Sequence, residues 1–152
     1  MVWVPSSHPE EFTGGHIDGI ARFINEDTVV IPKYIDQNML GASVFEDAAT
    51  AVKAAGLKVI RMDMPGTFRF DPKQSGESAT DLEAVYVNWL LANGVVIASG
   101  FGNPEWDASA KKAIEGFFPD RDVHMITTPT IWYYGGGVHC VTNDQPATTI
   151  IR

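Results

Sequence analysis

Cys140 is the residue of this chain whose type and setting most favour chemistry. It is the only cysteine, and it ends the run Gly135-Gly136-Gly137-Val138-His139-Cys140. Consecutive glycines let the backbone adopt positive φ and approach a ligand closely, and a lone cysteine accompanied by histidine and acids elsewhere is a candidate nucleophile. The alternative is a small buried hydrophobic residue. Glycines before Cys140 and four polar residues at 142–145 do not suit a core strand, so we favour the nucleophile.

His16 and Asp18 could supply the base and the anion that such a nucleophile needs. We expect a strand over residues 16–24, in which alternating side chains place His16 and Asp18 on one face. A thiolate is the attacking form of cysteine, and a protonated histidine beside it would stabilise it. Asp18 could then bind a cationic group. The pair could equally be a polar contact at a strand end, because spacing alone does not bring it to Cys140.

Composition narrows the class of protein. The 152 residues suit one domain, 1–152, with 45% hydrophobic and 20% charged residues. A net charge of −8 disfavours nucleic acid as a partner. No apolar run reaches the length of a membrane helix, and the N-terminus does not resemble a signal peptide. We expect a cytoplasmic protein with no membrane partner, because a single cysteine cannot form an internal disulfide. No His/Cys metal spacing occurs, so we also expect no metal.

Periodicity predicts alternating strands and helices. Ser43 and Glu46 have capping-box spacing before a helix that stops at Gly56, and Asp107 could cap a second helix. Asn93-Gly94 predicts a hairpin turn. The predicted strands, besides residues 16–24, cover residues 2–4, 28–31, 58–62, 95–98, 123–126, 131–134 and 148–151. Residues 65–81 are expected to be a long loop, and residues 82–91 are ambiguous, with 85–87 favouring a strand.

Two stretches share one plan of strand, helix and strand. Residues 28–62 and 94–126 each follow it, so we predict two copies of a ββαβ unit with pieces of further ones. A repeat at this scale is typical of stacked or propeller-like modules. The fold class is therefore α/β.

Several motifs, in this order and spacing, carry a family resemblance. They are Val2-Trp3-Val4-Pro5, Thr13-Gly14-Gly15-His16-Ile17-Asp18-Gly19, Arg22-Phe23-Ile24, Val85-Tyr86-Val87-Asn88-Trp89, Phe118-Pro119-Asp120-Arg121, Gly135-Gly136-Gly137-Val138-His139-Cys140-Val141-Thr142 and Gln145-Pro146. Together they resemble the C-terminal part of the agmatine deiminase and bacterial peptidylarginine deiminase family of the pentein superfamily.

The resemblance implies a role for each matched residue. Cys140 would attack the guanidinium carbon, His16 would be the general acid and base, and Asp18 would hold the guanidinium nitrogens. His139 would orient the cysteine turn. The implied substrate is a small guanidine, either agmatine or an arginine-like group, with no cofactor. The substrate-binding residues expected beside Asp18 are Asn88, Trp132, Gly136 and Gly137; Trp3, Tyr133 and Tyr134 could also line the pocket, although core packing is the commoner role for Trp3 and Tyr133.

The family fold has five ββαβ modules around a pseudo-fivefold axis, so the resemblance implies a partial pentein, or α/β propeller, that is incomplete. Phe12 stands where the family has an acid, and the family's first guanidinium-binding aspartate lies in the part that this chain does not match. We therefore expect weak or no activity from the chain alone. We also expect a homo-oligomer, most simply a dimer. The alternatives are a non-catalytic binding or assembly module and an amidinotransferase.

Overall fold

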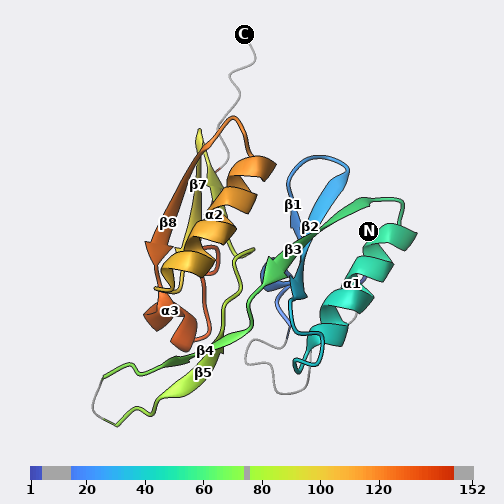
Figure 1. Cartoon of the computed structure of the whole chain (residues 1–152). Coiled ribbons are helices and arrows are strands. Elements are labelled where there is room, and N and C mark those ends of the chain that lie inside the picture. Colours follow the sequence, from blue (N-terminus) through green and yellow to red (C-terminus); the bar gives the residue numbers. More distant parts are fainter. Residues whose placement is uncertain (5–14, 74–75, 146–152) are drawn as a thin grey trace.

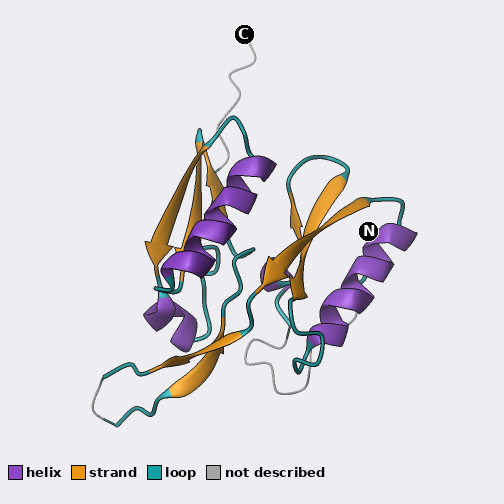
Figure 2. Ribbon diagram, viewed as in Figure 1, coloured by secondary structure: helices purple, strands orange, loops and turns teal. Residues whose placement is uncertain are grey.

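Two similar units lie side by side in the computed structural model, which describes residues 1–4, 15–73 and 76–145 (Figure 1). Each unit is a three-stranded sheet with one long helix packed on it (Figure 2). The first unit contains β1 (Arg22–Phe23), β2 (Thr28–Tyr34), α1 (Ala42–Ala54) and β3 (Lys58–Met64). The second contains β6 (Leu90–Ala92), β7 (Val95–Gly100), α2 (Pro104–Phe117) and β8 (Asp122–Thr127).

The two units have the same topology. β1 and β2 are antiparallel, and α1 carries the chain to β3, which is parallel to β2 with Val29 opposite Val59. β6, β7 and β8 repeat this arrangement around α2, with Val96 opposite Val123. The two predicted ββαβ units are confirmed. The fold is a mixed α/β structure consistent with a partial pentein, and its described strands do not close a barrel.

Local sequence explains where the two long helices begin. The Asn103 side chain accepts hydrogen bonds from the backbone N–H groups of Glu105 and Trp106, both at 3.1 Å, and Pro104 fits the first helical position. Asp107 was expected as the cap, but it lies inside α2. The capping box predicted at Ser43 is also wrong, because α1 already begins at Ala42 after Gly41, whose φ is 86°.

The core is continuous between the units. Buried residues of both sheets and both long helices form one cluster, which also includes most of a buried loop, residues 84–89. Trp89 in that loop packs edge-on against Phe118, with ring centroids 5.6 Å apart. Burial on both sides therefore fixes the loop that carries Asn88.

Several predicted strands are replaced by other structures. Residues 2–4 are not a strand, residues 85–87 belong to the buried loop, and residues 131–134 fall largely in the short helix α3 (Pro129–Tyr133). The expected long loop instead holds β4 (Thr67–Phe70), which pairs antiparallel with β5 (Thr80–Glu83) and projects beneath the two units (Figure 1). The strand predicted at residues 148–151 lies outside the described residues.

The strand predicted over residues 16–24 is also wrong. Gly15 has a φ of 87°, and the chain then forms a 3₁₀ turn, η1 (Ile17–Gly19), before the short strand β1. The left-handed glycine just before His16 and the 3₁₀ turn that follows both depart from the extended backbone that strand alternation requires. The turn aims Asp18 at the second unit.

Candidate active site

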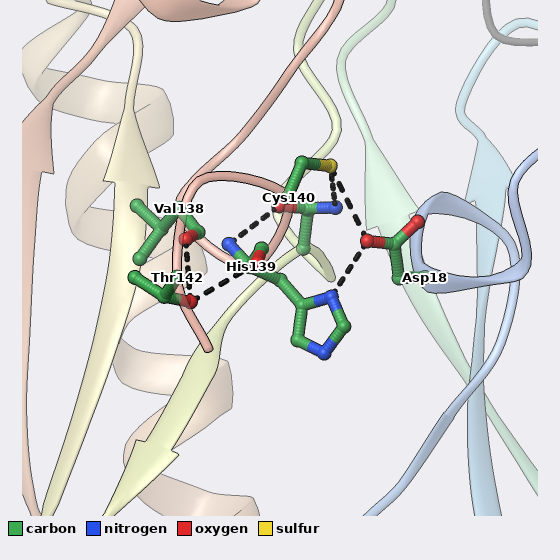
Figure 3. Close-up of polar contacts among 6 residues, drawn as sticks. Asp18, Val138, His139, Cys140 and Thr142 are labelled. Atoms are coloured by element: carbon green, nitrogen blue, oxygen red, sulfur yellow. Dashed lines mark hydrogen bonds and ion pairs between the residues drawn. The ribbon is translucent and has the colours of Figure 1, made fainter. Parts of the chain in front are cut away.

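The candidate site lies between the two units, where η1 faces the loop that follows α3. Asp18 comes from η1, and Cys140 comes from the loop (Figure 3). Their side chains point toward each other, and the Cys140 Sγ–H donates to Asp18 Oδ2 at 3.3 Å. Cys140 is exposed rather than buried. Its setting therefore differs from that of a packing cysteine.

Asp18 is held as an anion by several donors. His139 Nδ1 lies 2.7 Å from Asp18 Oδ2, and because a carboxylate only accepts, this nitrogen carries the proton. Burial of Asp18 by itself raises its pKa. Hydrogen bonds from His139, Cys140 and Asn88 and the charge of His139 oppose burial, and together they lower the pKa below its ordinary value. The carboxylate is thus ready to receive a cation at neutral pH.

Asn88 links the loop's backbone to the sulfur. Its amide Nδ2 donates to Cys140 Sγ at 3.2 Å, and its Oδ1 accepts from the backbone N–H of His139 at 2.9 Å. The side chain is buried, with 2% exposure. Thr142 Oγ1 closes the loop from the other end by donating to the carbonyls of Val138 and His139, at 2.9 and 3.0 Å (Figure 3). These bonds fix the position of the thiol.

Close packing explains why residue 137 in the glycine run is a glycine. A Cβ built there would lie 2.2 Å from Asn88 Oδ1 and 2.5 Å from Trp132 Cζ3, so only glycine lets the loop pack on both. Gly137 was expected to contact substrate, but it lies against these side chains and does not line the cavity. Gly136 and Trp132 do line it.

A cavity of about 480 Å³ opens beside the thiol. Its walls include His16, Asp18, Asn88, Cys140 and the two residues just named, so the structure brings together all the predicted site residues except Gly137. Tyr133 also lines the cavity, whereas Trp3 is an exposed residue of the N-terminal segment and Tyr134 is exposed and contacts Glu77. The size is within the range of small-molecule sites.

Arg22 is a site neighbour to which the sequence assigned no role. Its guanidinium lies over the ring of Trp89 at 5.9 Å, and its Nη1 is buried without a hydrogen-bond partner among the described residues. Burial lowers the pKa of Arg22, while the negative charges of Asp18 and Asp144 oppose that shift. Arg22 therefore places a fixed cation behind the acidic site. In the sequence, the only hint that Arg22 lies near the site is its position four residues after Asp18.

The structure was compared with the requirements of a metal site and of a membrane-spanning helix. The part of the chain that it describes contains no group of three or more His, Cys, Asp or Glu side chains arranged to hold a metal ion. None of the described helices is long and apolar enough to span a bilayer.

Comparisons with known proteins identify the family to which the chain is similar. Residues 1–146 match the model of the Porphyromonas-type peptidyl-arginine deiminase family. The chain belongs to this family. Agmatine deiminases of Stutzerimonas stutzeri and Medicago truncatula are each 29% identical to it over 97% of its length. The solved structure of Enterococcus faecalis agmatine deiminase is 25% identical and superposes with a TM-score of 0.80 over 95% of the chain.

The family match covers only part of those relatives. The chain spans 44% of each of the two curated proteins and 44% of the Enterococcus structure. Membership therefore supports the guanidino-modifying hydrolase class at the level of the family. The reaction, the substrate and the roles of individual residues in this chain are treated below as proposals.

Proposed function

We propose that this chain carries the cysteine-bearing part of a deiminase site and that Cys140 attacks the carbon of a guanidinium held by Asp18. The observation that carries this proposal is the Asp18 carboxylate, which lies 3.3 Å from Cys140 Sγ at the wall of an open cavity. A guanidinium stays cationic at neutral pH and prefers planar carboxylate partners. A guanidinium on Asp18 would place its carbon next to the sulfur.

The first half of the reaction removes ammonia. A substrate on Asp18 competes for the oxygen that accepts the thiol hydrogen, and the thiol proton passes to His16, the histidine that lines the cavity. The thiolate forms a C–S bond with the guanidinium carbon, which gives a neutral tetrahedral adduct. The protonated His16 returns the proton to one nitrogen, the C–N bond breaks, and ammonia leaves a cationic thiouronium on Cys140.

The second half restores the thiol. Water attacks the thiouronium carbon and gives a proton to His16, so a C–O bond forms. The C–S bond then breaks, the sulfur departs as thiolate, and the remaining hydroxyl proton passes to it. His16 gives the proton that it took from water to the released ammonia, so the products are a ureido compound and ammonium and His16 is neutral again. One water is consumed, and no oxidant or reductant is needed.

Three further residues have supporting roles in this scheme. Asn88 donates to the sulfur and would stabilise it as an anion, and His139 fixes one oxygen of Asp18. The half-buried Arg22 offsets the negative charge that accumulates around the thiolate. None of them contacts the leaving nitrogen in the scheme.

The test is release of ammonia and ureido product from agmatine and from peptidyl arginine by the purified chain. We expect low turnover that Cys140→Ser abolishes, and we expect the specific activity to fall on dilution if a second chain completes the site. Absence of any cysteine-dependent product at high protein concentration would favour the non-catalytic binding module. Transfer of the amidino group to an added amine in preference to water would favour the amidinotransferase.

A further inference from the structure

Arg22 differs from the other arginines that the structure describes. Arg61 and Arg69 each form an ion pair with a carboxylate, and Arg121 donates to a backbone carbonyl. Among the described residues, the Arg22 guanidinium has no hydrogen bond and no ion pair, and its Nη1 is buried. Partial burial of an unpaired charge costs free energy, so a residue of this kind beside a cleft is a candidate for a functional role.

The Arg22 guanidinium lies where the two units meet. Arg22 belongs to β1 of the first unit, and its Cζ is 5.9 Å from the centre of the Trp89 ring, in the buried loop that leads into β6. Trp89 is fully buried against Phe118, and its neighbour Asn88 donates to Cys140 Sγ at 3.2 Å. The aromatic ring therefore holds the guanidinium near the cysteine without neutralising its charge.

Arg22 is close enough to the site for its charge to act there. The carboxylates of Asp18 and Asp144 and the sulfur of Cys140 all lie within the range of Coulomb interaction with the guanidinium. Asp18 Oδ2 is itself 3.3 Å from Cys140 Sγ, so the carboxylate and the sulfur are exposed to the same positive charge. Because Arg22 is half-buried, water and salt screen this charge less than they would at the surface.

A fixed cation has opposite effects on the two charges that the proposed site must accept. It stabilises the thiolate of Cys140, which is the attacking form of the nucleophile. It also repels the guanidinium that Asp18 would hold. An arginine with its own carboxylate partner would do neither to the same extent, because the charge of the partner would cancel most of its field.

We propose that Arg22, kept free of any ion pair, favours the thiolate of Cys140 at the expense of affinity for the substrate cation. This inference rests on the proposed function and adds that one residue strengthens the nucleophile and weakens the binding of the guanidinium. Arg22 acts through its charge and makes no contact with the reacting atoms. It is therefore a positioning residue in the electrostatic sense.

The test compares Arg22→Gln, which removes the charge, with Arg22→Lys, which keeps it. The first readout is the rate at which chloroacetamide, a neutral reagent, alkylates Cys140 at pH 7. The second is the calorimetric affinity of agmatine for chains that also carry Cys140→Ser, which prevents turnover. We expect Arg22→Gln to slow alkylation and to tighten agmatine binding, each by about three- to tenfold, the effect of one charge several ångströms away. Arg22→Lys should restore both values to within about twofold of the natural chain.

The opposite signs of the two effects separate a charge from a packing role. If Arg22 only packed on Trp89, Arg22→Gln would impair alkylation and binding together, and that result would overturn the proposal, as would values equal to those of the natural chain. If Arg22→Gln does not fold, Arg22→Lys decides: loss of both readouts in a variant that keeps the charge contradicts the proposal, and retention of both supports it. Failure of agmatine to bind the chain carrying Cys140→Ser alone would instead overturn the proposed function, and this inference with it.

Discussion

Single side chains hold the candidate site together across long stretches of sequence. Asn88 reaches the thiol and the backbone of the cysteine loop, and Gly137 lets that loop close on Asn88. Asp18 meets the same loop from the other unit. The geometry of the thiol therefore depends on contacts between residues about 50 and 120 positions apart.

The fit at Gly137 predicts a sharp difference between two neighbouring glycines. Gly137→Ala would force its methyl group into Asn88 and Trp132, whereas the nearest atoms to a Cβ at Gly136 are 3.6 Å away. We expect Gly137→Ala to lower the free energy of unfolding by about 1–3 kcal/mol, the usual cost of overpacking. Gly136→Ala is the matched control and should cost less. Urea denaturation measures both, and equal losses would contradict the packing described here.

The pKa of Asp18 predicts how stability depends on pH. Because this pKa is lower in the folded chain than its ordinary value of 3.8, ionised Asp18 stabilises the fold above that value. The contribution is lost as pH falls through the folded pKa. Asp18→Asn should therefore be less stable than the natural chain at pH 6, and the difference should shrink at acidic pH. Unfolding curves at several pH values test this. A stability difference between the two proteins that grows on acidification would contradict the prediction.

At the scale of elements, Asp107 joins α2 to the loop that carries Asn88. Its Oδ1 accepts from the Tyr86 hydroxyl at 2.7 Å and from the backbone N–H of Phe101 at 2.9 Å, and its Oδ2 accepts from Gly102 at 3.0 Å. Asp107, which was expected to cap a helix, thus anchors a turn and a buried tyrosine. Tyr86 lies two residues before Asn88, so this anchor also supports the site.

We expect Asp107→Asn to lower the free energy of unfolding by about 1–3 kcal/mol, because an amide cannot accept all three hydrogen bonds without placing a donor against them. Tyr86→Phe removes one of the bonds and should cost about 1 kcal/mol. Denaturant titration of both variants provides the measurement. Asp107→Asn costing no more than Tyr86→Phe would show that the two backbone contacts contribute little.

Sequence patterns predicted the regular elements better than the site's surroundings. The two ββαβ units follow from periodicity, because each core strand and helix buries one continuous apolar face. The turn η1 and the helix α3 were taken for strands, since a positive φ at Gly15 and a proline at the start of a five-residue helix act locally and leave no periodic trace. The family resemblance named the site residues, but contacts such as Asn88 to His139 arise only when the two units pack.

At the scale of the whole molecule, the described surface retains large apolar side chains. Phe23 is 54% exposed, Ile17 is 53% exposed, and Ile126 on the edge strand β8 is 44% exposed. Exposed apolar residues and an unpaired strand edge favour association. We therefore still predict a homo-oligomer, most simply a dimer. Light scattering tests this, and a monodisperse monomer at micromolar concentration would count against it.

In the proposed site, Asp18 holds a cation beside a reactive Cys140. The most direct test is the rate at which Cys140 is alkylated by chloroacetamidine, which is cationic, relative to chloroacetamide, which is neutral and of the same shape. Mass spectrometry gives both rates without ambiguity, because Cys140 is the only cysteine. We predict that the cationic reagent is favoured in the natural chain and that Asp18→Asn lowers the ratio about tenfold or more. A ratio that Asp18→Asn leaves unchanged would contradict the claim.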